Sequence, residues 1–160
     1  MIKQDPHPSS GDRGWIINIA SILGWTGALN TTSYCASKGA VVNLTRAAAL
    51  DCAPQRIHVN SIGPGYTESA MTSPLFANPA TKAKLLAKHP FRGLGKPEDI
   101  ARVCLFLASE ESQWCTGVIT VLLPKKLQTL TRRLGVYSSR RGLLVPVRSP
   151  SGFSVPGVWS

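Results

Sequence analysis

The feature that most constrains the fold is an alternation of short apolar runs with longer segments of helical periodicity. The run from Trp15 to Ala20 is too short for a helix and rich in β-branched residues, which is typical of a strand buried on both faces. The segment from Ser33 to Ala53 predicts a helix, and Ile57 to Ile62 predicts a second strand that Gly63-Pro64-Gly65 ends. One face of that helix carries small and apolar side chains, namely Ala36, Ala40, Leu44 and Ala47. A strand, a helix and a strand in this order predict a parallel βαβ unit.

The second half of the pattern repeats the alternation. A short helix is expected over about Thr81 to Lys88, and a clear one opens at Pro97-Glu98-Asp99, where acidic residues suit the positive end of a helix. Its apolar residues follow helical spacing: Ile100, Val103, Cys104 and Leu107. A third strand is expected over Val118 to Leu123. The sequence therefore predicts an α/β fold, a partial Rossmann-like, doubly wound parallel sheet of about three strands with flanking helices.

The positive charge of the chain is concentrated at its C-terminal end. Residues 125–160 hold seven of the eighteen Lys and Arg residues and none of the eight acidic ones, so they supply +7 of the net charge of +10. Arginine pairs alternate there with Ser, Gly and Pro, and hydrophobic periodicity is lost. We expect two parts: residues 1–124 as the folded part, and residues 125–160 as a disordered basic tail. Such a tail could anchor the chain to nucleic acid or an acidic membrane, but a solvated extension is the favoured explanation, because basic runs are usually solvated.

Cysteine usage and hydropathy narrow the class of protein further. The four cysteines form no C-x-x-C pair, which argues against a zinc site or a disulfide scaffold: Cys35, Cys52, Cys104 and Cys115. We therefore expect reduced thiols, no bound metal and a cytoplasmic location. The longest charge-free stretch, Gly14 to Ser37, is too polar to cross a bilayer, and the first fourteen residues lack the apolar core of a secretory signal. We expect no membrane span.

Three residues form a candidate catalytic set. Tyr34 and Lys38 lie four residues apart at the start of the predicted helix, so both side chains project from one face. An ammonium beside a phenol favours the phenolate, which suits a general acid and base near neutral pH. Ser21 follows the first strand, where open α/β sheets bind their ligands. Each residue also has an ordinary structural explanation, as a surface pair and as a turn serine.

Together these residues resemble the catalytic core of the short-chain dehydrogenase/reductase family. The resemblance rests on Ile17-Asn18-Ile19-Ala20-Ser21 and on Tyr34-Cys35-Ala36-Ser37-Lys38. Val59-Asn60-Ser61-Ile62-Gly63-Pro64-Gly65-Tyr66-Thr67 is similar to the family's strand and Pro-Gly turn beside the nicotinamide. Gly95-Lys96-Pro97-Glu98-Asp99-Ile100-Ala101 and Leu105-Phe106-Leu107-Ala108-Ser109 are similar to its later helix. The resemblance covers about residues 1–123.

The resemblance implies hydride transfer between NAD or NADP and a small-molecule alcohol or carbonyl substrate. Tyr34 would exchange the hydroxyl proton, and Ser21 would hydrogen-bond the reacting oxygen. Lys38 would hold the nicotinamide ribose as well as favouring the Tyr34 phenolate. The nicotinamide would lie against Pro64 and Gly65, with Thr67 and Ser69 at its carboxamide. The residues implied to cover the substrate, which core packing would explain equally well, are Met71, Leu75, Phe76 and Phe91.

The glycine-rich turn that receives the cofactor pyrophosphate in this family is not found in the sequence. The sequence contains two Gly-x-Gly runs, Gly63-Pro64-Gly65 and Gly93-Leu94-Gly95, and in the first of them proline removes a backbone donor. We therefore expect the chain to be a truncated catalytic half that is weak or inactive alone. Strand 15–20 would then lack the neighbour that makes it central in such folds, and its exposed edge would invite association.

Three functions compete on the sequence alone. The first is an NAD(P)-dependent oxidoreductase. The second is a non-catalytic truncated module that joins full-length subunits, because in the resembled family the helix bearing Tyr34 and Lys38 also packs between subunits; a homo-oligomer is equally compatible. The third, a nucleic-acid binder, rests on the tail alone and is disfavoured, because only Tyr137, Phe153 and Trp159 supply aromatic rings there.

Overall fold

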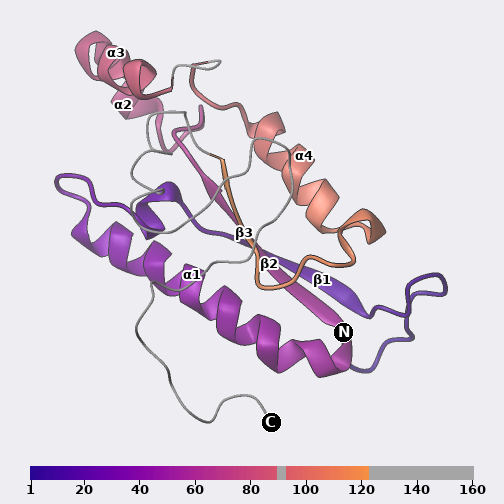
Figure 1. Cartoon of the computed structure of the whole chain (residues 1–160). Helices are drawn as coiled ribbons and strands as arrows, with labels where there is room; N and C mark the ends of the chain where they lie inside the picture. The colour runs from indigo at the N-terminus through magenta and orange to yellow at the C-terminus, as the bar shows by residue number, and fades with distance from the viewer. Residues whose placement is uncertain (90–92, 123–160) are drawn as a thin grey trace, which may run out of the picture.

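The computed structural model describes residues 1–89 and 93–122, which form a three-stranded parallel sheet with helices on both faces (Figure 1). The strands are β1 (Gly14–Ile19), β2 (Ile57–Pro64) and β3 (Ile119–Leu122), in the order β1-β2-β3. Ile19 pairs with Ile62, and Pro64 pairs with Leu122, so the carboxyl ends of the strands share one end of the sheet. The α/β fold expected from the sequence is confirmed.

Two long helices cover the sheet from opposite sides. Helix α1 (Thr32–Cys52) lies on one face and α4 (Pro97–Leu107) on the other (Figure 1). Two shorter helices, α2 (Ser73–Ala77) and α3 (Pro79–Lys88), lie beyond the carboxyl end of β2. Single turns of 3-10 helix complete the chain: η1 (Ile22–Gly24), η2 (Ala53–Gln55) and η3 (Glu110–Ser112).

The predicted elements occur with small differences in their bounds. β2 continues through Gly63 to Pro64, because a proline at the last strand position loses no ladder hydrogen bond, and the N–H of Gly65 donates to Leu122 O (3.1 Å). Helix α2 was not predicted, since five residues carry too little periodicity to be recognised. The predicted end of the third strand at Leu123, the side chain of Phe91 and the basic tail 125–160 lie outside the described residues.

The buried face of α1 differs from the face that the sequence pattern marks. Its buried residues are Val42, Thr45 and Ala49, whereas the face of Ala36, Ala40, Leu44 and Ala47 is exposed. The Asn18 side-chain N–H donates to Thr45 Oγ1 (3.0 Å), so a polar contact from β1 fixes which face turns inward. An exposed apolar face therefore remains on α1, with Leu44 59% exposed.

The main hydrophobic core lies between the sheet and α4. Ile62, Leu107 and Cys115 are its buried centre. Asn60, completely buried in β2, joins this core to the approach to β3: its Nδ2 donates to Cys115 O (2.6 Å), and its Oδ1 accepts from Val118 N (3.1 Å). The side chain of Asn60 thus replaces hydrogen bonds that the irregular segment before β3 cannot obtain from a strand.

β1 forms one edge of the sheet, since it pairs only with β2 among the residues that the structure describes. Ile19, at the carboxyl end of that edge, is 46% exposed. Gly14 is buried, Trp15, Ile16, Ile17 and Asn18 are half-buried and Ile19 is exposed, so within residues 1–89 and 93–122 the strand is partly rather than fully buried on its two faces. None of the helices in this part of the chain is both long and apolar enough to span a membrane.

Candidate active site

Ser21 enters the site directly from the end of β1. The N–H of Ala20 donates to Ile62 O (2.7 Å), which extends the pairing of β1 with β2 by one residue. Ser21 then adopts extended backbone and caps η1, with its Oγ accepting from Leu23 N (3.1 Å). The side chain is buried, and because Oγ is an acceptor in the cap, its O–H proton is still available to donate to a ligand.

Two glycines allow the turn after Ser21 to pack closely on both neighbours. A Cβ on Gly24 would lie 2.9 Å from the backbone oxygen of Lys38, so η1 meets α1 with no space for a side chain. A Cβ on Gly63 would lie 2.8 Å from Cζ3 of Trp25, so β2 accepts the indole ring directly against its backbone. Ser21 is thereby held between β2 and the start of α1.

Tyr34 and Lys38 occupy the first two turns of α1, as their spacing predicted. Lys38 Nζ lies 5.8 Å from the centroid of the Tyr34 ring and donates a hydrogen bond to Ile19 O (2.9 Å). The ammonium is therefore anchored at the carboxyl end of β1, beside the phenol. It has three N–H donors, of which the carbonyl of Ile19 takes one.

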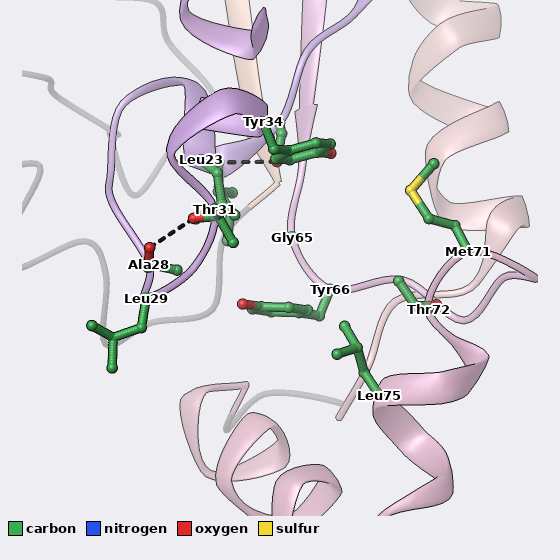
Figure 2. Close-up of a pocket in the computed structure, with 12 residues that line it drawn as sticks. Leu23, Ala28, Leu29, Thr31, Tyr34, Gly65, Tyr66, Met71, Thr72 and Leu75 are labelled. Atoms are coloured by element: carbon green, nitrogen blue, oxygen red, sulfur yellow. Dashed lines mark hydrogen bonds between the residues drawn. The ribbon is translucent and has the colours of Figure 1, made fainter. Parts of the chain in front are cut away.

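A cavity of about 310 Å³ opens beside Tyr34 (Figure 2). Its walls come from the segment after β1, the start of α1, the segment after β2, and α2. The lining residues are Ser21, Ile22, Leu23, Ala28, Leu29, Thr31, Tyr34, Gly65, Tyr66, Met71, Thr72 and Leu75. The cavity brings together three of the residues predicted from the sequence, Ser21, Tyr34 and Gly65. The other four predicted site residues, Lys38, Pro64, Thr67 and Ser69, do not line it.

The segment after β2 is held by its own hydroxyl groups. Thr72 Oγ1 donates to Thr67 O (2.6 Å) and accepts from the N–H of Ser69 (3.0 Å). The hydroxyl of Thr67 donates to Gly65 O (3.2 Å), and Ser69 Oγ lies 3.1 Å from Thr72 Oγ1. These bonds fold the chain into a tight loop that directs Met71 toward the cavity (Figure 2).

Tyr66 is a wall of the cavity that the sequence analysis did not single out. Figure 2 shows its ring and the Tyr34 ring on either side of Gly65. The N–H of Tyr66 donates to Nε2 of the buried His89 (3.2 Å), whose Nδ1 must therefore carry the proton and donate to Leu85 O (2.8 Å). The rings of Tyr66 and His89 also meet edge to face, with centroids 5.7 Å apart. A residue directly after Gly65 at a strand end was the available signal for Tyr66.

Of the residues that the resemblance placed over the substrate, Met71 and Leu75 line the cavity and Phe76 does not. The described lining carries no Lys, Arg, His, Asp or Glu. No group of three or more His, Cys, Asp or Glu residues in residues 1–89 and 93–122 is arranged to hold a metal ion. The functional groups at the cavity are therefore hydroxyl groups, with the ammonium of Lys38 nearby. This combination suits proton transfer to an oxygen atom.

Comparison with known proteins agrees with this geometry. The sequence profile of a family described as enoyl-(acyl carrier protein) reductase matches residues 3–122. The chain is 39% identical over 113 residues to cis-4-hydroxycyclohexanecarboxylate dehydrogenase of Sinomonas cyclohexanicum, covering 71% of this chain and 45% of that enzyme. It is 43% identical over 109 residues to mouse (Mus musculus) (3R)-3-hydroxyacyl-CoA dehydrogenase, covering 68% and 41%. The chain thus spans less than half the length of these relatives.

Solved structures give the same result. A protein from Beutenbergia cavernae described as an NAD(P)-dependent gluconate 5-dehydrogenase, with bound NADP, superimposes with a TM-score of 0.66 at 38% identity. The match covers 68% of this chain and 43% of that one. The relatives named here are dehydrogenases, and one of them holds a nicotinamide cofactor in its structure. The chain belongs to the short-chain dehydrogenase/reductase family.

Proposed function

We propose that Ser21, Tyr34 and Lys38 carry out the proton-transfer part of an NAD(P)-dependent conversion between an alcohol and a carbonyl compound. The observation that supports this most directly is that Ser21 and Tyr34 line one cavity, with the Lys38 ammonium 5.8 Å from the Tyr34 ring centroid. When bound, the nicotinamide ring supplies or accepts the hydride.

In the reducing direction, Tyr34 gives its phenolic proton to the substrate oxygen as negative charge develops there. In the oxidising direction, the phenolate removes the same proton. Ser21 donates its O–H to that oxygen, because the other capacity of its hydroxyl is used to cap η1. A donor fixed in advance by a helix cap loses little freedom when the transition state forms, which is the condition for electrostatic stabilisation.

Lys38 has the donors that a ribose requires. One N–H is bound to Ile19 O, and the remaining two suit a pair of ribose hydroxyls at the carboxyl end of β1. The same ammonium lies 5.8 Å from the centroid of the Tyr34 ring, so we assign Lys38 to both cofactor binding and support of the proton transfer. The donor chemistry of the site therefore fits the ribose end of NAD or NADP.

The nicotinamide is assigned to Pro64, Gly65, Thr67 and Ser69. Gly65 lines the cavity next to Ser21 and Tyr34, where the absence of a side chain lets a flat ring approach the backbone. Thr67 and Ser69 have their hydroxyls in bonds within the loop, to Gly65 O and Thr72 Oγ1. For these two residues to bind the carboxamide, the hydroxyls must exchange those contacts for the ligand.

In this family a glycine-rich turn receives the pyrophosphate end of the cofactor, and the 160 residues of the sequence contain no such turn. The activity is therefore best tested in a chimera in which the cofactor-binding half of a relative precedes residues 1–124. There, Tyr34→Phe keeps the ring and its packing but loses the proton, so turnover should fall at least about 100-fold. Retention of near-parental turnover would remove the catalytic assignment.

Ser21 has a matched control in Ser73, an exposed serine whose hydroxyl donates to Ala70 O (3.0 Å). In the chimera, Ser21→Ala should lower kcat with little change in cofactor affinity, whereas Ser73→Ala should change neither. Lys38→Met should weaken cofactor binding and lower kcat together. A fall in cofactor affinity alone, with kcat intact, would restrict Lys38 to binding.

The exposed apolar face of α1 and the open edge of β1 favour a second candidate function. In it, the chain is a non-catalytic module that joins other subunits of this family. Leu44 and Leu50 are 59% and 75% exposed on α1. Such surfaces are usual at protein interfaces. Light scattering after size exclusion of the chain mixed with a full-length relative distinguishes the cases: separate elution of the two proteins at micromolar concentration contradicts this second function. The cytoplasmic location and the division at residue 124 stay predictions.

A further inference from the structure

We infer that the substrate of this site is an uncharged, largely apolar ketone or secondary alcohol, whose hydrocarbon part lies against Leu29, Met71 and Leu75. The inference rests on the proposed function for the identity of the reacting group, a carbonyl or hydroxyl. It goes beyond that function by naming the chemical class of the rest of the molecule.

The first observation is the distribution of polar groups around the cavity. Of its five hydroxyl groups, those of Thr31 and Thr72 already donate to backbone oxygens, Ala28 O at 2.7 Å and Thr67 O at 2.6 Å. The hydroxyl protons that no recorded bond uses in the described part of the chain belong to Ser21, Tyr34 and Tyr66. A ligand in the cavity can therefore accept hydrogen bonds from the hydroxyl groups of Ser21, Tyr34 and Tyr66. The apolar side chains of the lining offer it only hydrocarbon contacts.

The second observation is the absence of charge in the described lining. A carboxylate, phosphate or ammonium that gives up water to contact these twelve residues gains no ionic partner among them. A neutral group of the same size loses less hydration on binding there. Charged groups are thus selected against by the wall itself.

The third observation is the apolar rim. Leu29 is 94% exposed, Met71 is 77% exposed and Leu75 is 44% exposed, although all three line the same cavity. Figure 2 shows them projecting from three separate segments, the loop before α1, the loop after β2, and α2 itself. Exposed apolar side chains that line one cavity are typical of a surface that an apolar ligand covers.

The rim is held in place rather than loosely attached. Asn30 adopts a left-handed backbone conformation with φ of 60°, and the Thr31 hydroxyl closes the turn onto Ala28 O, which presents Leu29 outward. On the other side, the Thr72 hydroxyl fixes the loop that bears Met71. Prearranged apolar contacts cost little ordering when a ligand binds.

The test measures binding of two ketones of equal length to the full 160-residue chain by ligand-observed NMR, with no cofactor present. The probes are 2-octanone and 7-oxooctanoate, which differ by a terminal carboxylate. We expect 2-octanone to bind at least ten times more tightly. Equal affinities, tighter binding of 7-oxooctanoate, or binding of neither probe below 10 mM would overturn the inference.

A charge placed on the rim should reverse the preference. Leu75→Lys is expected to weaken binding of 2-octanone and strengthen that of 7-oxooctanoate, because Leu75 is partly exposed and a lysine there can meet the carboxylate. The control is Leu105→Lys, since Leu105 is 73% exposed on α4 and does not line the cavity. It should leave both affinities unchanged. An equal response to the two lysines would refute a role for the rim.

These outcomes are separate from those of the proposed function. If Tyr34→Phe leaves turnover of the chimera intact while 2-octanone still binds preferentially, the catalytic roles fail and the ligand class stands. If turnover falls as expected but 7-oxooctanoate is the tighter ligand, the catalytic roles stand and the ligand class fails.

Discussion

Replacing Gly24 with alanine tests whether the close contact between η1 and α1 positions Ser21. The new Cβ would lie 2.9 Å from Lys38 O and 3.0 Å from Cγ2 of Val42. The nearer atom belongs to the helix backbone, so it cannot move away as the end of a flexible side chain could. Either η1 must separate from α1 or the helix must bend, and Ser21 begins the segment that moves.

The size of the effect follows from two opposing contributions. Overpacking of a closely packed contact costs about 1–3 kcal/mol, and a glycine-to-alanine change returns about 0.4–1 kcal/mol by restricting the unfolded chain. The net loss of unfolding free energy should be about 1–2 kcal/mol. With a urea m-value of about 2 kcal/mol per M, the midpoint of unfolding would fall by about 0.5–1 M.

Gly27, three residues along the same segment, provides the control. A Cβ there would meet no atom within 4 Å, so Gly27→Ala should leave the midpoint unchanged or raise it slightly. Urea unfolding followed by far-ultraviolet circular dichroism measures both variants. If the two alanines shift the midpoint in the same direction and by the same amount, the contact with Lys38 O does not determine the position of η1.

Other perturbations have equally direct expectations. Asn60→Ala leaves Cys115 O and Val118 N unpaired in the core, so unfolding free energy should fall by about 2–5 kcal/mol. The control Asn43→Ala should change the unfolding free energy by less than about 0.5 kcal/mol, because Asn43 is exposed. An equally small loss for Asn60→Ala would show that the two hydrogen bonds of Asn60 do not stabilise the fold. Burial raises the pKa of the Cys115 thiol, so at pH 8 iodoacetamide should alkylate Cys115 more slowly than the half-buried Cys52, as peptide mass spectrometry can determine. Deletion of residues 125–160, which carry seven basic and no acidic residues, should abolish most salt-sensitive retention on heparin; unchanged retention would assign the basic surface to residues 1–124.

The sequence was most informative where side-chain period and chemistry coincide. Lys38 four residues after Tyr34 predicted adjacent side chains, and the structure has the ammonium 5.8 Å from the ring centroid. The strands were recognisable because β-branched runs end at Gly63-Pro64-Gly65 and begin after Gly117. In each case a local rule of helix or strand geometry was sufficient.

It was least informative where a choice depends on contacts between distant segments. Helix α1 carries small residues on most sides, so its period did not identify the face of Val42, Thr45 and Ala49 as the buried one. The partner of Thr45 is Asn18, which lies in another element. Tyr66 lines the cavity, and its N–H donates to His89, which lies 23 residues away along the chain. No local sequence pattern predicts a contact over that separation.

The hydrogen bonds of Asn60 also bear on the order in which the chain folds. They join residues 55 and 58 positions apart, and both bind the segment that leads into β3. During synthesis, β1, α1 and β2 emerge before β3, and the side chain of Asn60 cannot bind Cys115 O and Val118 N until residues 115–118 follow. Closure of the sheet by β3 is therefore the step that removes this polar group from water at no net loss of hydrogen bonds. The loop between Asn60 and residues 115–118 must close before these hydrogen bonds can stabilise the sheet. We therefore expect β1 and β2 to remain only loosely paired on a nascent chain that ends before Cys115.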